Sequence, residues 1–390
     1  MKKILFTAMA LLPLLSVPTL NAEVTVVEKN QFKFSASGRI LFDGALFGPR
    51  GDTFSDGVAM PDVRIGGKAS FGKFAANLDM GYGMQKLSFK DVYIEYAPNE
   101  HHTIRLGYFV HQFGLNAATS SSMKPTFQPQ TTDDFFGACS RRIGAMYVFD
   151  KGPWFIAASA YASGKSLSEY ANTQGKISAG GLGRFVWRPF HTTGNVMQIG
   201  VSPLYQGAAH TRLENGETSP GSFNFSANFP TAVNNVDLVK AQIPEARGVF
   251  QITPELLLSK DRFALESQYY YMNVNRRDGL KNYTAHGVYG MGRILLLGDK
   301  EYWYSDNVGC LATPGKNTLE AVIGYNYTNA NCNKAGILGG ITNDYSLTLN
   351  YYINKYVICR LRYSYTNVWG SPTGIDTHVN IIQARVMFKF

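Results

Sequence analysis

The last thirteen residues of the chain, HVNIIQARVMFKF, alternate between apolar and polar side chains. The apolar positions are Ile382, Ala384, Val386, Phe388 and Phe390. The polar side chains between them include Gln383, Arg385 and Lys389. Because successive side chains of a β-strand point to opposite faces, this segment predicts a strand with one apolar face and one face in contact with water.

The same alternation recurs along the rest of the chain, in segments bounded by turn-forming residues. Together with the terminal segment it predicts sixteen strands: 31–43, 60–70, 73–80, 91–97, 102–110, 142–149, 154–163, 176–188, 195–205, 248–258, 262–272, 287–297, 317–327, 345–353, 356–365 and 378–390. Most of these are near the length of about 9 to 11 residues that a tilted strand needs to cross a bilayer.

The connections between the predicted strands alternate between short and long. Residues 71–72 and 354–355 are short, whereas 111–141 and 206–247 are long. The connection 298–316 is an exception, since it falls on the short side but spans 19 residues. This pattern predicts an all-β fold: a transmembrane antiparallel β-barrel of sixteen strands with short periplasmic turns and long extracellular loops.

Charged residues fall on one face of each predicted strand. In strand 176–188, for example, Arg184 and Arg188 share a face, and Phe185 and Trp187 lie on the other. An Arg or Lys on the lipid side near the bilayer midplane costs about 2–4 kcal/mol, so the charged faces are expected to line a water-filled lumen.

The predicted lumen is strongly basic. The strand segments hold sixteen basic and eight acidic inward residues, an excess of eight positive charges. Such a wall concentrates anions and repels cations, although any one charge can instead pair across the lumen. The candidate pore-lining and anion-binding residues are Arg39, Arg64, Arg105, Lys124, Arg142, Arg184, Arg188, Arg262, Arg293, Arg360, Arg362 and Arg385.

A lumen of sixteen strands is too wide for wall side chains to fill, so another segment must narrow it. We expect the loop 111–141 to fold inward as the constriction, with Lys124, Asp133 and Asp134 at the narrowest point. The longer connection 206–247 is equally able to fold inward.

The N-terminus is typical of an exported protein. Residues 1–22 combine Lys2 and Lys3 with an apolar run, which predicts a signal peptide cleaved after Ala22 and a barrel domain over 23–390. The full chain carries +9, and loss of the two lysines leaves +7. We therefore expect the protein in the outer membrane of a Gram-negative-type cell, in contact with membrane lipid.

The sequence offers little for catalysis, metals or nucleic acid. It contains no G-x-S-x-G, the seven histidines show no H-E-x-x-H spacing, and the four cysteines show no C-x-x-C spacing. We predict no enzyme activity and no cofactor. The basic residues point inward between strands rather than along one exposed face, so nucleic-acid binding is not expected.

Several segments resemble the phosphate-selective porin O and P family. IRLGYFVHQFGLNAATSSS is similar to that family's strand and constriction-loop segment, and YGMGRILLLGDKEYW to a later strand and turn. The terminal ARVMFKF is similar to its last strand. The resemblance implies a sixteen-stranded porin, a homotrimer and passive transport of small anions, with phosphate as a candidate solute. Arg105 is the residue that matches one of the family's basic positions.

Other functions remain open from the sequence. The chain could form a general or hydrophobic-solute channel of the outer membrane, or a structural or adhesin barrel without an open pore. Composition alone also fits a secreted array of β-sandwiches.

Overall fold

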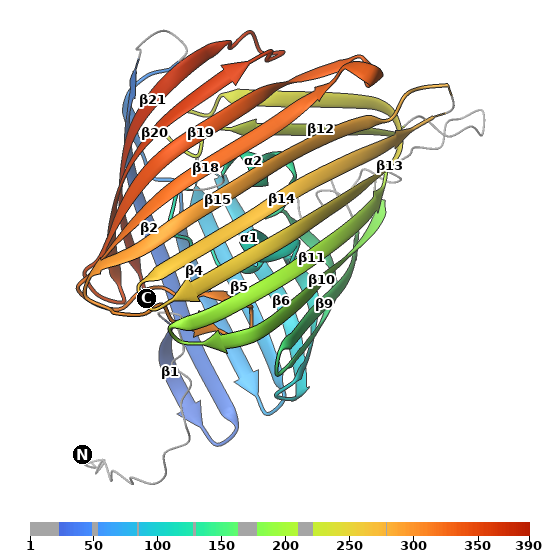
Figure 1. Ribbon diagram of the computed structural model, residues 1–390. Helices are drawn as coiled ribbons and strands as arrows, with labels where there is room; N and C mark the ends of the chain where they lie inside the picture. Colours follow the sequence, from blue (N-terminus) through green and yellow to red (C-terminus); the bar gives the residue numbers. More distant parts are fainter. Residues whose placement is uncertain are drawn as a thin grey trace, which may run out of the picture.

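The chain forms a closed antiparallel β-barrel of sixteen wall strands in the computed structural model, as the alternation predicts (Figure 1). The structure describes residues 23–48, 54–83, 86–127, 130–162, 178–209, 221–277 and 279–390. Strand β2 hydrogen-bonds to β21, which closes the barrel between the two ends of the chain.

The wall strands follow the order of the sequence. They are β2 (Phe32–Gly48), β4 (Val63–Phe71), β5 (Phe74–Gly83), β6 (Lys86–Asn99), β7 (His102–Val110), β8 (Arg141–Lys151), β9 (Trp154–Ala162), β10 (Ala179–Thr192), β11 (Asn195–Gly207), β13 (Asp237–Lys260), β14 (Phe263–Arg276), β15 (Tyr283–Leu297), β18 (Thr318–Cys332), β19 (Ile337–Tyr352), β20 (Val357–Trp369) and β21 (Thr377–Lys389). The remaining elements are β1 (Val24–Lys29), β3 (Gly57–Ala59), β12 (Gly221–Asn228), β16 (Tyr304–Ser305), β17 (Cys310–Leu311), α1 (Gly114–Ala118), α2 (Thr131–Phe135) and η1 (Asn333–Ala335).

Every predicted strand has a counterpart, but some ends differ. β13 and β19 begin well before the predicted starts at 248 and 345, so their extracellular ends reach further. β10 begins at Ala179, and residues 176–177 of the predicted strand lie outside the described residues.

The predicted faces are also observed. On β21, Ile382 and Phe388 are 49% and 42% exposed, whereas Arg385 and Met387 are 5% and 1% exposed. The outward face is the apolar one, as expected for a surface in contact with lipid. Within the described residues, no helix is long and apolar enough to cross a membrane.

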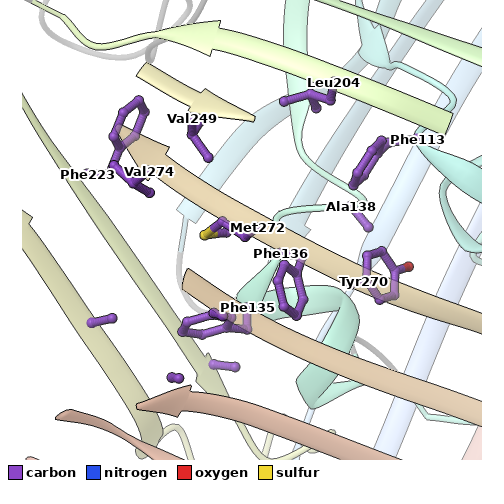
Figure 2. Close-up of a cluster of buried hydrophobic side chains, with 14 of the residues drawn as sticks. Phe113, Phe135, Phe136, Ala138, Leu204, Phe223, Val249, Tyr270, Met272 and Val274 are labelled. Carbon is purple, nitrogen blue, oxygen red and sulfur yellow. The ribbon is translucent and has the colours of Figure 1, made fainter. Parts of the chain in front are cut away.

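Among the described residues, three connections fold into the barrel. The inward loop, residues 111–140, carries α1 and α2, which lie inside the barrel in Figure 1. Its Phe113, Phe135 and Phe136 pack near Tyr270 and Met272 of β14 (Figure 2). This side chain packing fixes the loop against the β10–β18 side of the wall.

The second inward connection precedes β13. Phe229 is 1% exposed and packs edge-on against Phe47 and Phe54 near the extracellular end of β2. Gln383 of β21 donates to the backbone carbonyl of Pro230 at 3.2 Å. Part of the long connection after β11 therefore also occupies the lumen.

The third is the periplasmic turn, residues 298–317, which includes the segment that broke the predicted alternation of lengths. It contains the small β16–β17 hairpin and is held by buried side chains of the wall. Leu115 and Met123 of the inward loop pack in one cluster with Cys310 and Leu311 of this turn. An extracellular loop and a periplasmic turn thus meet inside the barrel.

Candidate solute pathway

The described residues enclose a cavity of about 730 Å³ along the β2 and β4–β8 side of the wall. The inward loop borders it through Ser120, Ser121 and Lys124, and the periplasmic turn borders it through Asn307 and Val308. The opposite half of the lumen is packed with the inward loop and the turn. Solutes that cross the barrel would therefore pass along the β2–β8 side.

A group of basic side chains, here called the seam patch, lies where β2 and β21 close the barrel. It consists of Arg39, Arg64, Arg360, Arg385 and Lys389. Strand pairing places Arg39 between Lys389 on one neighbouring strand and Arg64 on the other, directly opposite each, and places Arg360 opposite Arg385. Directly opposite residues on one face have Cβ atoms about 4.5–5.5 Å apart, so these charges are close neighbours.

Two carboxylates pair with the seam patch. Arg39 Nε donates to Asp62 Oδ2 at 3.0 Å, and Arg64 lies 3.3 Å from the same oxygen. Arg385 forms two hydrogen bonds of 2.6 Å to Asp43. Five cations against two paired carboxylates leave a local excess of three positive charges.

The inward loop rests on the seam patch. Arg39 Nη1 donates to Ser121 Oγ at 2.7 Å, and Lys389 Nζ to the carbonyl of Ser122 at 3.3 Å. Arg360 donates to the carbonyls of Lys124 and Thr126 at 2.7 and 2.6 Å. Part of the basic wall therefore anchors the loop, while Arg39, Arg64 and Arg385 border the cavity.

The wall between β4 and β8 carries both signs of charge. Arg105 donates to Glu95 at 3.1 and 2.6 Å and stacks over the Tyr93 ring at 4.1 Å. Arg141 forms hydrogen bonds of 3.0 and 3.1 Å to Asp91. These pairs fix the wall but contribute little net charge.

Over the whole cavity lining, the positive and negative charges of the described residues are equal in number. The basic members are Arg39, Arg64, Lys68, Arg105, Lys124, Arg141 and Arg385. The acidic members are Glu23, Asp62, Asp79, Asp91, Glu95, Asp133 and Asp134. The positive excess counted along the strands therefore does not extend to the open space as a whole, and is concentrated at the seam patch.

Two of the acidic members lie on α2 of the inward loop. Asp133 accepts hydrogen bonds from Tyr270 Oη at 2.6 Å and Asn116 Nδ2 at 2.5 Å. Burial raises its pKa to about 6, against the opposing effect of Lys124. Burial likewise raises the pKa of Asp134 to about 6. Lys124 donates to Asn116 and to Cys139 Sγ, the latter at 3.2 Å.

Five of the twelve predicted pore-lining residues border the cavity. They are Arg39, Arg64, Arg105, Lys124 and Arg385. Five others are buried in contacts with protein groups: Arg184, Arg188, Arg293, Arg360 and Arg362. Arg142 lies on the wall beside Tyr161, and Arg262 lies in the turn between β13 and β14. Sequence periodicity selects the inward face, but it does not show which parts of that face the inward segments cover.

The buried arginines bind protein partners. Arg293 pairs with Glu320 at 2.9 Å, and Arg362 with Asp344 at 2.5 Å. Arg188 pairs with Asp150 and donates to the carbonyl of Asp306 in the periplasmic turn at 2.6 Å. These residues stabilise the packed half of the lumen rather than the open half.

Some residues that border the cavity are not predicted by the alternation of the sequence. Arg141 adjoins Arg142, so strict alternation places it in the loop, yet it is the first residue of β8 and borders the cavity. Ser120 and Ser121 carry no periodic signal, because they belong to an irregular loop. All four cysteines, Cys139, Cys310, Cys332 and Cys359, are free thiols. Within the described residues, no cluster of side chains suited to a metal ion is present.

A closed sixteen-stranded barrel with a lipid-facing apolar surface, a polar lumen and an inward loop defines an outer-membrane porin. The sequence model of the family described as phosphate-selective porin O and P matches residues 59–390, and the chain belongs to this family.

Solved porins share the fold at low sequence identity. OmpT of Vibrio cholerae superposes with a TM-score of 0.59 at 9% identity, over 93% of this chain and 99% of that chain. The anion-selective porin from Comamonas acidovorans gives 0.57 at 8% identity, over 92% and 100%. OmpF of Salmonella typhi gives 0.54 at 12% identity, over 92% and 98%. No curated protein matches the chain in sequence.

Proposed function

We propose that this porin is a passive channel for small anionic solutes, with phosphate among them. The observation that carries the proposal is the seam patch, which holds five cations and two paired carboxylates and borders the cavity through Arg39, Arg64 and Arg385. In a confined lumen such an excess attracts anions at short range.

The inward loop acts in this proposal as the constriction. Ser120 and Ser121 border the cavity opposite the wall, and Arg39 donates to Ser121. A solute that passes between loop and wall meets guanidinium groups and hydroxyl groups together. Guanidinium groups bind planar and tetrahedral oxyanions through paired N–H donors, which favours phosphate and carboxylates over halides.

A general porin is the second candidate function. It is favoured by the balance of seven basic and seven acidic side chains around the cavity. A neutral lining would pass small polar solutes of either charge, and selectivity would then be weak. The two functions differ in whether the local charge of the seam patch or the total charge of the lining governs permeation.

The assembly of the protein and its export are proposed on two further grounds. One of the solved relatives is OmpT of Vibrio cholerae described in a trimer form, and we propose a homotrimer here as well. Residues 1–22, which lie outside the described residues, are proposed as the cleaved signal peptide.

The test is the reversal potential of the purified porin in a planar bilayer under a potassium chloride gradient. A unit charge about 4 Å away attracts an ion by ~1 kcal/mol in bulk water and ~4 kcal/mol at an effective dielectric of about 20. Arg64→Gln should therefore lower the anion-to-cation permeability ratio several-fold, whereas the matched change Arg262→Gln, in a turn away from the cavity, should not.

Phosphate is tested in the same bilayers by adding it to a chloride solution. If phosphate occupies the seam patch, it should reduce the chloride current in a saturable way, and Arg64→Gln should weaken that block. A wild-type channel that prefers cations, or that never opens, would overturn the proposed function. Equal permeability ratios in wild type and Arg64→Gln would favour the general porin.

A further inference from the structure

Arg142 is unlike the other inward arginines of the wall. Arg184 pairs with Glu255, Arg293 with Glu320 and Arg362 with Asp344. Arg142 has no carboxylate partner among the described residues, and its Nη1 atom is shielded from solvent without a hydrogen bond. Arg142 is only partly buried, but a shielded guanidinium donor without a partner or a counter-charge is unfavourable.

The surroundings of Arg142 supply more unpaired donors. Its guanidinium carbon lies 4.7 Å from the centre of the Tyr161 ring. Tyr161 is 4% exposed, and its hydroxyl oxygen is buried without a hydrogen bond. Ser159, two residues earlier on the same inward face of β9, has a buried hydroxyl that is also unpaired. Three donor groups on two adjacent strands thus remain unsatisfied.

Two glycines fix the position of Tyr161. Strand pairing places Gly144 and Gly180 opposite Tyr161 on its two neighbouring strands. A Cβ at Gly144 would lie 2.7 Å from the Tyr161 Cβ, and a Cβ at Gly180 would lie 2.6 Å from its ring. The Tyr161 ring therefore occupies the space that side chains at positions 144 and 180 would need. It is held closely by the backbone there and cannot shift easily to give its hydroxyl a hydrogen-bond partner.

His111 closes one side of the group. Its ring lies 5.2 Å from the Tyr161 ring, and it is fully buried. Nε2 lies 3.2 Å from the carbonyl of Arg142, and a carbonyl only accepts, so Nε2 carries the hydrogen. Burial lowers the pKa of His111 to about 4, so the ring is neutral at pH 7 and its Nδ1 holds a lone pair. His111 orients the backbone of Arg142 and donates nothing inward.

We propose that Arg142 and Tyr161 form a binding site for a small inorganic anion, separate from the seam patch. Arg142 Nη1 is a donor and the Tyr161 hydroxyl can donate, so a halide or an oxyanion can accept from both, whereas the unpaired Nδ1 of His111 is an acceptor and does not contribute. The site lies at the extracellular end of the wall, since Arg142 follows the inward loop at the start of β8. A bound anion would supply the counter-charge that the described residues do not.

This proposal is independent of channel selectivity, because it concerns an anion held by the wall. The direct test is a crystal of the purified porin soaked in sodium bromide, since bromide is located by its anomalous scattering. A bromide peak is expected within hydrogen-bond distance of Arg142 Nη1 and the Tyr161 hydroxyl. Lack of a peak there would overturn the proposal.

The second test follows the thermal unfolding of the porin in detergent, with sodium bromide replacing sodium gluconate at constant ionic strength. An anion that binds the folded state raises the unfolding midpoint with the logarithm of its concentration. Wild type should show this rise, and Arg142→Met should lose it. Arg262→Met is the matched control and should keep it.

If Arg142→Met fails to fold, Tyr161→Phe replaces it, because the ring packing is kept and one donor is removed. Tyr161→Phe should need several-fold more bromide for the same rise in midpoint. Equal dependence on bromide in wild type, Arg142→Met and Tyr161→Phe would refute the site, even if the channel proves anion-selective.

Discussion

Arg184 links three parts of the lumen, and its removal tests the view that the periplasmic turn is held inside the barrel. The side chain is fully buried and donates to both oxygens of Glu255, at 3.0 and 2.7 Å. It also donates to the carbonyls of Val308 and Gly309 in the turn, at 2.7 and 3.0 Å. A fifth hydrogen bond, of 3.1 Å, reaches Gln112 of the inward loop.

Replacing Arg184 with Met keeps much of the volume but leaves Glu255 buried with Gln198 as its remaining partner, at 2.8 Å. Removing one partner of a buried ion pair typically costs about 3–5 kcal/mol. The Val308 carbonyl also loses this donor, whereas the Gly309 carbonyl keeps a hydrogen bond of 3.0 Å from Gln198 Nε2. We therefore expect Arg184→Met to unfold at lower urea concentration in detergent, by an amount equivalent to a few kcal/mol.

The second readout is single-channel conductance. If Arg184 holds the turn in the lumen, its loss should free the turn and give a larger, noisier conductance. Arg184→Met combined with Glu255→Leu should recover part of the stability, because no unpaired charge remains. Arg262→Met serves as the control that alters an arginine outside the lumen. Unchanged stability and conductance in Arg184→Met would refute this account of the turn.

Two further predictions concern the inward loop. Because the pKa values of Asp133 and Asp134 are raised to about 6, their ionised forms are disfavoured in the fold, so stability should fall as the pH rises from about 4 to about 6, level off above that, and return on acidification. Unfolding midpoints measured between about pH 4 and pH 7 should show this slope and its levelling, and Asp133→Asn with Asp134→Asn should flatten it. Deleting residues 116–136 should raise conductance, since the loop occupies the lumen; a deletion variant that folds with unchanged conductance would contradict the constriction.

The alternation of residue types was sufficient to predict the wall of this barrel. It gave the number of strands and the outward faces, because lipid excludes charge from one face of every strand. Ile382 and Phe388 lie outside and Arg385 inside for that reason. The length of the connection 298–316 also indicates an unusual turn from the sequence alone.

The same alternation could not predict which segments fold into the lumen and which part of the wall they cover. Arg105 and Arg184 have equivalent signals in the sequence, yet one borders the cavity and the other lies under the periplasmic turn. Their difference depends on where irregular segments dock, which is set by contacts between residues far apart in the chain. The hydrogen bond of Arg360 to the carbonyl of Thr126 joins residues 234 positions apart and has no local signature.

The closure of the barrel has a consequence for its assembly. Arg385 and Asp43 pair across 342 positions, and the backbone of Phe390 hydrogen-bonds to Gly38. The seam patch draws its charges from the first two and the last two wall strands, so during folding these two groups of charges stay apart until the sheet has curled completely round. A barrel arrested before closure would expose an unpaired edge and would lack the chemical environment proposed to attract anions. Selectivity and completion of the fold would then arise in the same step.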